Sequence, residues 1–477
     1  MREAWGATGR RAARWARAPR PTPRLPARML VVALAFVVVG GLGVFLDRTV
    51  GRSASDAASS GELTSGAWFC PHGGGSSWRG WVIVGNPGGR RVSVRATTFG
   101  ESGVLQEQSI AVPPRTQVYR TVPADETGAA TEIEFFGGWV GAAFVVSAGG
   151  EEAGVAASEC QGASRDDWFV MDQPTGPSES AYTVVMNPFF GPAEFDVVIR
   201  TPRRTVRPSV LSPYVLGPRR SVALRINRFA LEAPGEETVT VEINQRIGRV
   251  VAGSLGVVPD GIRTEGGVGT RKRWLIPARA TEPSTLLLVN PASLRAVLSG
   301  VAEEKASEQP LFEGKRLRLP PGAVAGEDLG AIDKAALVLE STNGREVATG
   351  VVVEAEKGDS AAIGGVLRPE EGWLVLPGTP PEGGRQLLIL QNPARTEASV
   401  RVSFIGPDGP FVGREVGSVR VPGGRTVEME IPAGPEGNPL TAVVEAERGT
   451  VVAAQTSYSG DDLGYASSVG LPMREEE

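Results

Sequence analysis

The sequence predicts an all-β protein in which four similar β domains follow one another in a row after a single N-terminal transmembrane helix. Two observations carry the β prediction: a motif that recurs four times, and short strand-like segments inside each recurrence. A third, an uncharged apolar stretch near the N-terminus, carries the transmembrane prediction. A period near 100 residues exceeds that of solenoid units and matches one small β-sandwich.

Each repeat opens with a tryptophan that leads, after 16–19 residues, to an apolar run ending in Asn-Pro. The Asn-Pro pairs lie 101, 103 and 102 residues apart. Proline cannot donate to a β-ladder and so ends the strand, while the asparagine side chain can bond nearby backbone and fix the turn. We therefore assign these residues a structural role: Trp68, Asn86, Pro87, Trp168, Asn187, Pro188, Trp274, Asn290, Pro291, Trp373, Asn392 and Pro393.

The remaining segments of each repeat also predict strands. Residues 91–96, 194–200 and 398–404 alternate between apolar and polar side chains, as expected for a sheet with one buried face. About seven short strands per repeat indicate immunoglobulin-like β-sandwiches, whereas the blades of the alternative, a β-propeller, repeat at 40–50 residues. The predicted domains are residues 67–163, 164–265, 266–369 and 370–472.

Residues 29–46 are 18 consecutive residues without a charge, long enough for a helix of roughly 27 Å that spans a bilayer. Eight arginines and one acid precede them, which places residues 1–28 in the cytoplasm and the repeats outside. Residues 47–66, rich in Ser, Gly and Ala, predict a flexible stalk. A cleaved signal peptide, cut among the small residues 53–60, is the alternative.

The chain has two cysteines, Cys70 and Cys160, which bracket the first repeat. An oxidising compartment favours a disulfide between them. The competing interpretation is a metal site, because His72, the only histidine, lies two residues from Cys70. Three ligands without a spaced pair do not form a typical structural metal site, so we predict the disulfide and no metal.

An arginine-rich segment is the main electrostatic anomaly. Residues 200–228 hold eight arginines and no acid. Arginine forks can bind phosphate or carboxylate groups, so we predict an anion site at Arg203, Arg204, Arg207, Arg219 and Arg220. A solvated strand face in an arginine-biased sequence is the alternative. Because the predicted topology places this segment outside the membrane, we expect anionic lipid or wall polymer rather than nucleic acid as partner.

Catalytic constellations are scarce in the sequence. A Ser-His-Asp triad would have to use His72, and there is no nucleophile elbow, phosphate-binding loop or zinc-protease motif. The repeat tryptophans could stack on sugars, but their recurrence before apolar residues favours a core role. Trp78, Trp81 and Trp139 lack counterparts in other repeats and are better candidates for exposed function. We expect no enzyme activity, catalytic residue or cofactor.

The order of these motifs resembles the immunoglobulin-like repeats of bacterial cell-surface proteins. With the N-terminal apolar segment, the chain is similar to the actinobacterial membrane-anchored family DUF5719, over residues 67 to about 470. The third repeat departs most, since residues 302–309 are polar where a clean strand is expected. The resemblance implies a cell-envelope setting and transfers no functional residue.

We therefore expect a single-pass membrane protein whose exported domains form a non-catalytic scaffold or binding module of the cell envelope. Its partner would be an anionic envelope polymer or a membrane protein. An accessory subunit of a membrane glycosyltransferase or another envelope-assembly enzyme is the alternative. An enzyme acting on wall glycan is disfavoured by the missing motifs.

Overall fold

A computed structural model describes residues 64–473, except 231–238, 260, 278–282, 305–306, 313–315, 330–334, 355–359, 412–415 and 460–463. Contacts divide the chain into residues 1–60 and one compact unit of residues 61–477. The predicted tail, membrane helix and nearly all of the stalk lie outside the described residues. Within the described ranges, no helix is long and apolar enough to cross a bilayer.

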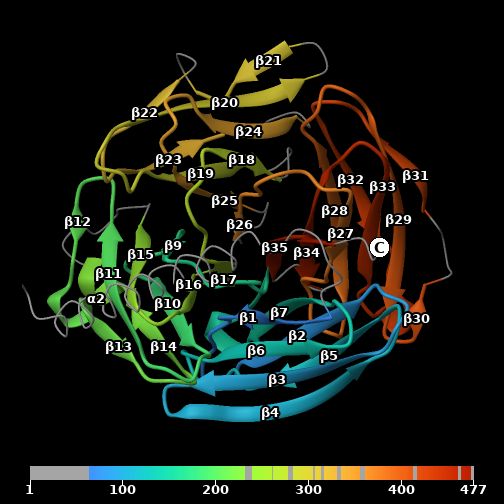
Figure 1. Ribbon diagram of the computed structural model, residues 1–477, viewed down its shortest axis with the longest axis horizontal. Coiled ribbons are helices and arrows are strands. Elements are labelled where there is room, and N and C mark those ends of the chain that lie inside the picture. The colour runs from blue at the N-terminus through green and yellow to red at the C-terminus, as the bar shows by residue number, and fades with distance from the viewer. Residues whose placement is uncertain are drawn as a thin grey trace, which may run out of the picture. The chain divides into compact units, whose positions relative to one another are not determined.

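Each repeat consists of two antiparallel sheets that face each other across an apolar core (Figure 1). In repeat 1 the first sheet has the strand order β1-β6-β3-β4 and the second has β5-β2-β7-β8. Val82 and Val84 of the second sheet share a core with Val94, Ile133 and Phe135 of the first. The strands are β1 (Ser65–Cys70), β2 (Arg79–Asn86), β3 (Val92–Gly100), β4 (Gly103–Val112), β5 (Thr116–Val122), β6 (Ala130–Phe136), β7 (Gly141–Ala148) and β8 (Gly154–Glu159).

The other three repeats follow the same plan, so the all-β prediction is confirmed. Repeat 2 has β9 (Asp167–Val170), β10 (Ser180–Asn187), β11 (Ala193–Arg200), β12 (Thr205–Val206), β13 (Tyr214–Leu216), β14 (Arg220–Arg225), β15 (Thr240–Ile247), β16 (Val251–Val258) and β17 (Gly261–Gly266). Repeat 3 has β18 (Arg273–Ile276), β19 (Ser284–Val289), β20 (Ala296–Glu304), β21 (Ser307–Pro310), β22 (Leu317–Leu319), β23 (Val324–Asp328), β24 (Ala336–Ser341), β25 (Ala348–Glu354) and β26 (Ser360–Gly364). Repeat 4 has β27 (Gly372–Val375), β28 (Gly384–Asn392), β29 (Ala398–Gly406), β30 (Gly409–Pro410), β31 (Val416–Val421), β32 (Arg425–Ile431), β33 (Thr441–Arg448), β34 (Val452–Ser459), β35 (Tyr465–Val469) and β36 (Leu471–Pro472).

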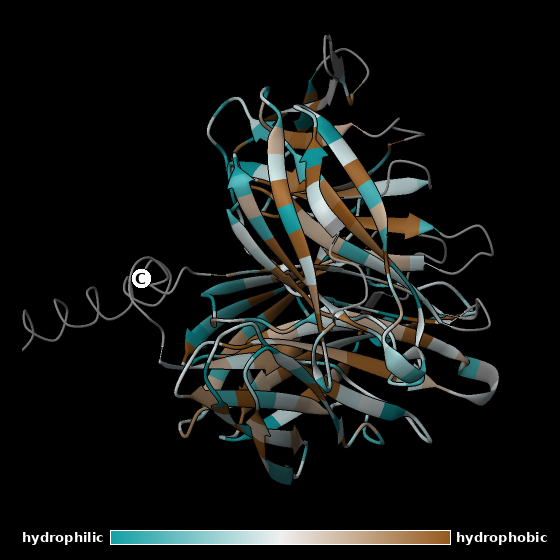
Figure 2. Ribbon diagram, turned by 90° about the vertical axis from the view of Figure 1, so that its right-hand side faces the viewer, coloured by the Kyte–Doolittle hydropathy of each residue, from teal (hydrophilic) through white to brown (hydrophobic). Residues whose placement is uncertain are grey.

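Side-chain patterns explain where each strand lies. The strand before Asn-Pro has neighbours on both sides, and β2 is accordingly buried along nearly its whole length. The strand after the turn alternates, with Val92 and Val94 buried and Ser93 and Arg95 exposed on β3. Figure 2 shows the same alternation of apolar and polar residues along strands of repeat 4. The polar segment of repeat 3 also forms a strand, since β21 pairs with β20.

The asparagine of each Asn-Pro pair is buried and bonds to equivalent backbone segments in all four repeats. Its exposed fraction is 1% or less in every copy. In repeat 3, Asn290 Nδ2 donates to the carbonyl oxygens of Leu294, Leu319 and Pro320 at 3.0, 3.0 and 2.8 Å. Its Oδ1 accepts from the Ala292 amide at 3.2 Å. The side chain thus joins its own turn to the loop that precedes β23.

The repeat tryptophans are core residues. Trp168, Trp274 and Trp373 are at most 3% exposed, and Trp68 is partly buried. Each indole donates to a carbonyl just before β7, β16, β25 or β34, which fixes the first strand against the opposite sheet. The bonds are Trp68 to Val140 at 2.7 Å, Trp168 to Val250 at 2.9 Å, Trp274 to Val347 at 2.9 Å and Trp373 to Val451 at 2.7 Å.

Exposed function at the unmatched tryptophans of repeat 1 is not supported. Trp78 and Trp81 are each 6% exposed, and Trp139 is partly buried. Trp81 and Trp139 pack against apolar residues of repeat 4, including Leu374 and Leu471. These tryptophans are therefore not candidates for exposed function, because they belong to apolar clusters that extend between repeats.

The repeats form a closed cycle of contacts rather than a row. The last strands of the second sheets, β8, β17, β26 and β35, each contact the next, and β35 contacts β8. Figure 1 shows the cycle within the compact unit, from repeat 1 in blue through green and yellow to repeat 4 in red. Apolar clusters cross every junction, for example Phe169 and Met171 of repeat 2 with Leu287 of repeat 3.

The junction between the first and last repeats is polar as well as apolar. Gln117, which is fully buried at the start of β5, bonds to Thr441 and to the carbonyl of Pro439. The Tyr119 hydroxyl donates to the Thr379 carbonyl at 3.1 Å. Because buried polar groups need partners, these bonds favour one arrangement of repeat 4 against repeat 1.

The predicted disulfide is confirmed: Cys70 at the end of β1 is bonded to Cys160, which follows β8. Both cysteines are buried. Beside the bond, Phe69 and Gln161 form a backbone bridge, so β1 also meets the segment that follows the second sheet. Because both thiols are in the disulfide, the metal-site alternative is wrong.

We predict that Asn290→Ala lowers the free energy of unfolding by about 3 kcal/mol, because the carbonyls of Leu294, Leu319 and Pro320 lose a donor that is itself fully buried. Urea unfolding followed by circular dichroism measures the change. Asn438→Ala is the control, since Asn438 makes one exposed bond to Pro435 and its loss should cost less than about 0.5 kcal/mol. Equal effects of the two substitutions would contradict the structural role.

We predict that replacing Cys70 and Cys160 together by serine lowers stability by about 4–5 kcal/mol, the chain-entropy value for a loop of 90 residues. Because apolar clusters join repeat 1 to repeats 2 and 4, calorimetry should show one transition that moves as a whole. A separate early transition of repeat 1 alone would show that the repeats unfold independently.

Candidate functional site

His72 is buried and has partners on both ring nitrogens. Nδ1 donates to the Gly73 carbonyl at 2.7 Å, and Nε2 accepts from the Thr131 hydroxyl at 2.9 Å. Burial lowers the pKa of His72 to about 4, and the Gly73 bond only partly offsets this effect. The ring is therefore neutral near pH 7 and holds the segment after Cys70 in place.

The most unusual chemistry of the described residues lies where the four last strands meet. Three carboxyl groups are enclosed there: Glu159 on β8, Glu265 on β17 and Asp172 after β9. Burial is the largest cause that raises the pKa of each of them. We call Glu159, Asp172 and Glu265 the central acids.

Glu265 reaches from repeat 2 into a recess of repeat 3. A Cβ atom on Gly350 of β25 would come within 2.8 Å of Glu265 Oε1, and one on Gly364 within 3.8 Å. Glycine at these positions therefore leaves room for the carboxyl group. Both Glu265 oxygens are buried without a hydrogen-bond partner among the described residues. Burial, then the charges of Asp172 and Glu159, raise its pKa well above the usual range.

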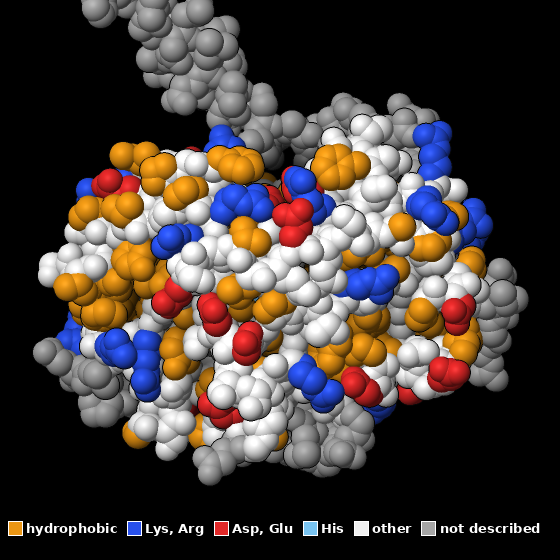
Figure 3. Space-filling model, turned by 90° about the horizontal axis from the view of Figure 1, so that it is seen from below, with side chains coloured by type: hydrophobic (Ala, Val, Ile, Leu, Met, Phe, Trp, Pro, Cys, Tyr) orange, Lys and Arg blue, Asp and Glu red, His pale blue; other side chains and the backbone are white. Residues whose placement is uncertain are grey.

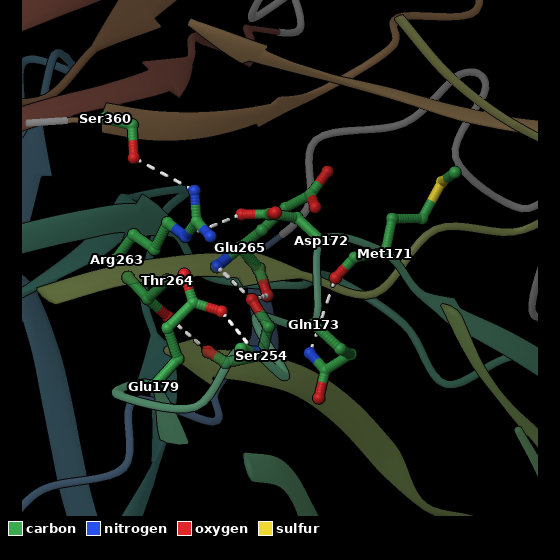
Figure 4. A network of polar contacts seen from close by, with 10 residues as sticks. Met171, Asp172, Gln173, Glu179, Ser254, Arg263, Thr264, Glu265 and Ser360 are labelled. Carbon is green, nitrogen blue, oxygen red and sulfur yellow. Dashed lines mark hydrogen bonds and ion pairs between the residues drawn. The ribbon is translucent and has the colours of Figure 1, made fainter. Parts of the chain in front are cut away.

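Asp172 has an opposite charge beside it (Figure 4). Arg263 Nε lies 3.0 Å from Asp172 Oδ2, and both side chains are largely buried. The Arg263 charge lowers the pKa of Asp172, but burial outweighs it and the net direction is upward. The Arg263 Nη1 group also donates to the Ser360 hydroxyl of repeat 3 at 2.9 Å. One guanidinium thus connects repeats 2 and 3.

Glu159 connects repeat 1 to repeat 4. Its Oε2 accepts from the Val469 amide of β35 at 3.3 Å and from the Ser158 hydroxyl at 3.3 Å. Burial nevertheless raises its pKa to about 7. The central acids therefore lie at contacts between repeats and retain protons more readily than exposed carboxyl groups.

The arrangement is suited to joining the repeats. In the described part of the chain, no group of three or more His, Cys, Asp or Glu side chains could hold a metal ion. Each central acid contacts a neighbouring repeat directly or through Arg263. Buried polar groups of this kind favour one packing arrangement over others, which is the role the geometry supports.

The arginine-rich segment divides between the two ends of β11. Arg200 ends the strand, forms an ion pair with Glu242 at 2.5 Å and donates to the Gly322 carbonyl of repeat 3 at 3.2 Å. At the other end, Ala193 pairs with Leu216, three residues before Arg219. Eight residues of strand separate the two ends by about 20 Å.

Arg219 belongs to the junction with repeat 1. Its guanidinium lies 5.1 Å from the ring centre of Phe99 and 5.3 Å from that of Phe190. It is also 4.0 Å from a Glu132 carboxyl oxygen. Arg203, Arg207 and Arg220 are exposed, whereas Arg204 and Arg219 are partly buried. Arg203, Arg204 and Arg207 therefore do not share one site with Arg219 and Arg220, and anion binding stays a prediction.

Figure 3 shows a further face, seen from below Figure 1, where basic and acidic side chains are interspersed among apolar ones. On the first sheet of repeat 1, Arg95 and Glu134 form one such pair of opposite charges, 2.5 Å apart. The view shows no continuous surface of one charge. A polyanion would meet repulsion as well as attraction there.

Sequence reasoning missed the central acids and Arg263. A weak signal was present, since Glu159 precedes Cys160 and Glu265 precedes two glycines in segments that otherwise predict buried strands. A lone acid in such a segment can equally face solvent at a strand end. Only contacts between repeats decide that these carboxyl groups are enclosed.

Comparison with known proteins supports a family assignment. The model of a family of unknown function, DUF5719, matches residues 127–366 and 368–466. The chain belongs to this family. No curated protein matches it. A solved tetra-tandem repeat from the extending region of a large adhesion protein covers 81% of this chain and 93% of its own, with 9% identity and a TM-score of 0.10.

We predict that the compact unit is less stable at pH 8 than at pH 5.5. A carboxyl group with a raised pKa in the folded state keeps its proton there, whereas the unfolded chain ionises near pH 4.5, so stability falls as pH rises. For Glu159 the shift to about 7 corresponds to roughly 3 kcal/mol, lost between about pH 4.5 and 7. Thermal unfolding across this range measures the effect.

Glu265→Gln and Glu159→Gln should each raise stability at pH 8 and flatten the pH profile, because a neutral amide replaces a buried carboxylate. Glu430→Gln is the control, because the Glu430 side chain is 63% exposed. Its stability should depend on pH in the same way as that of the parent. Identical profiles for all three variants and the parent would show that the central acids are not buried in solution.

Proposed function

We propose that this DUF5719 member is a single-pass membrane protein of an actinobacterial cell envelope, with its repeats on the outer side. In this proposal the repeats are immunoglobulin-like and act as a non-catalytic scaffold or binding module. The apolar residues 29–46, preceded by eight arginines, support the anchoring and the orientation. The disulfide between Cys70 and Cys160 supports export, because such bonds persist in oxidising compartments.

The observation that carries the scaffold proposal is the use of the repeated polar and aromatic residues inside the fold. The Asn-Pro asparagines and the tryptophans are bonded to backbone carbonyls, and the central acids lie at contacts between repeats. Gln117, Tyr119 and the apolar clusters hold the first repeat against the last. A unit built in this way holds its outer surfaces in fixed relative positions, as a binding platform requires.

We predict that protease added to intact protoplasts cuts the stalk and releases a soluble fragment of about residues 61–477. Residues 47–66 are the expected cleavage site because their composition predicts a flexible chain. The compact unit should resist cleavage, because most of its backbone is held in paired strands. Immunoblotting of pellet and supernatant measures the release, and a cytoplasmic protein serves as control. Full-length chain in the pellet after treatment would contradict the outward orientation.

Purification of the full chain after crosslinking on intact cells identifies the partner class. Copurifying envelope polymer supports the binding module. One stoichiometric membrane protein supports instead the second candidate, an accessory subunit of a glycosyltransferase or another envelope-assembly enzyme. Turnover of wall glycan by the purified chain would overturn the non-catalytic assignment.

A further inference from the structure

Exposed apolar side chains gather on repeat 2. Of the large hydrophobic residues that are exposed in the described part of the chain, half lie in this repeat. Phe190, in the turn after Asn187-Pro188, is 85% exposed. Val215 of β13 and Ile247 of β15 are 63% and 60% exposed. They lie on either side of Glu194 of β11, with which both are paired in the sheet. All three lie at the end of the first sheet where β11 begins.

Arginines surround these side chains. Arg219 stacks near Phe190 at 5.3 Å, and its amide bonds to the Phe189 carbonyl at 3.2 Å. Arg220 and Arg249 are exposed at the same end, since Gly248 lies against Pro192 and Ala193. Among the acids of this region, Glu194 and Asp196 are paired with Arg246 at 3.7 and 2.7 Å, and Glu132 lies 4.0 Å from Arg219. We call Phe190, Val215, Arg219, Arg220, Ile247 and Arg249 the repeat-2 rim.

The rim lies beside β1, the first strand of the compact unit. Phe69 of β1 and Phe189 have ring centres 6.0 Å apart. β1 begins at Ser65, four residues or about 13 Å of strand before Phe69. From Leu46, the last apolar residue before the stalk, 18 residues lead to β1 and span at most about 60 Å. On the proposed anchoring by residues 29–46, this length of chain allows the rim to reach the bilayer surface.

We infer that the repeat-2 rim rests on a bilayer surface that carries anionic headgroups. Phe190, Val215 and Ile247 contact the boundary between headgroups and acyl chains, and the exposed Arg220 and Arg249 face the phosphates, while Arg219 holds the Phe190 ring. Exposed aromatic and aliphatic residues beside arginine are the combination that binds this boundary. The tether makes the contact intramolecular, so weak attraction is enough. The inference rests on the proposed membrane anchoring.

The test places a photo-crosslinking benzoylphenylalanine at position 190 of the full chain, reconstituted in lipid nanodiscs. Discs contain phosphatidylcholine alone or mixed with phosphatidylglycerol, and mass spectrometry detects lipid adducts. The matched control carries the probe at Leu294, which is 52% exposed in the corresponding turn of repeat 3. We expect adducts at 190 in the anionic discs, well above the level at 294.

Arg220→Gln combined with Arg249→Gln should reduce the adduct at 190 by about tenfold, because each arginine near an anionic surface adds to the attraction. Both arginines are exposed, so thermal unfolding should match the parent. An adduct at 190 no stronger than at 294, or equal in neutral and anionic discs, would overturn the inference.

Failure of the proposed membrane anchoring can be distinguished from failure of the rim inference. A chain that carbonate extracts from the discs is not embedded, and the proposed membrane span then fails. The inference is tested separately by adding that chain to phosphatidylglycerol vesicles and measuring cosedimentation. Binding that Phe190→Ser removes would support the rim, and absence of binding would overturn it.

Discussion

The buried asparagine amide of each Asn-Pro pair is the interaction on which the repeat depends. The proline ends the strand, and the asparagine then bonds the carbonyls of its own turn and of the loop that leads to the first edge strand of the second sheet. The amide is buried in every copy, and one of the carbonyls that it bonds is buried with it. The tryptophan of the first sheet has a comparable role. Its indole donates to a carbonyl next to the second sheet, and this carbonyl would otherwise be buried without a donor.

Closure of the four repeats into a cycle imposes a second constraint. Each repeat must present apolar residues on the sides that meet its neighbours, and the clusters that contain Trp81, Phe169 or Ile389 extend across such junctions. Polar residues then select one arrangement. Arg263 connects Asp172 to Ser360, and Gln117 connects repeat 1 to repeat 4. The central acids lie at the same contacts, where burial disfavours their charged forms.

These constraints bear on the proposed function. Residues that looked chemically versatile in the sequence, among them His72, Arg200 and Arg219, have partners inside the fold or at junctions. Recognition by this protein therefore falls to outer surfaces. The rim of repeat 2 differs from the mixed surface of repeat 1 because apolar side chains and arginines occur there together, beside β1, the first strand of the compact unit.

Local signals in the sequence were enough to predict the repeat, the β character of each unit and the disulfide. Spacing of Trp and Asn-Pro fixes strand ends locally, and two cysteines that bracket one repeat leave a single pairing. Tertiary structure alone decided that the row closes into a cycle, that Trp81 lies at a junction and that Glu159 and Glu265 are enclosed. It also separated Arg203 from Arg219 by the length of β11. The physical reason is that burial between repeats depends on contacts over hundreds of residues, which local periodicity does not encode.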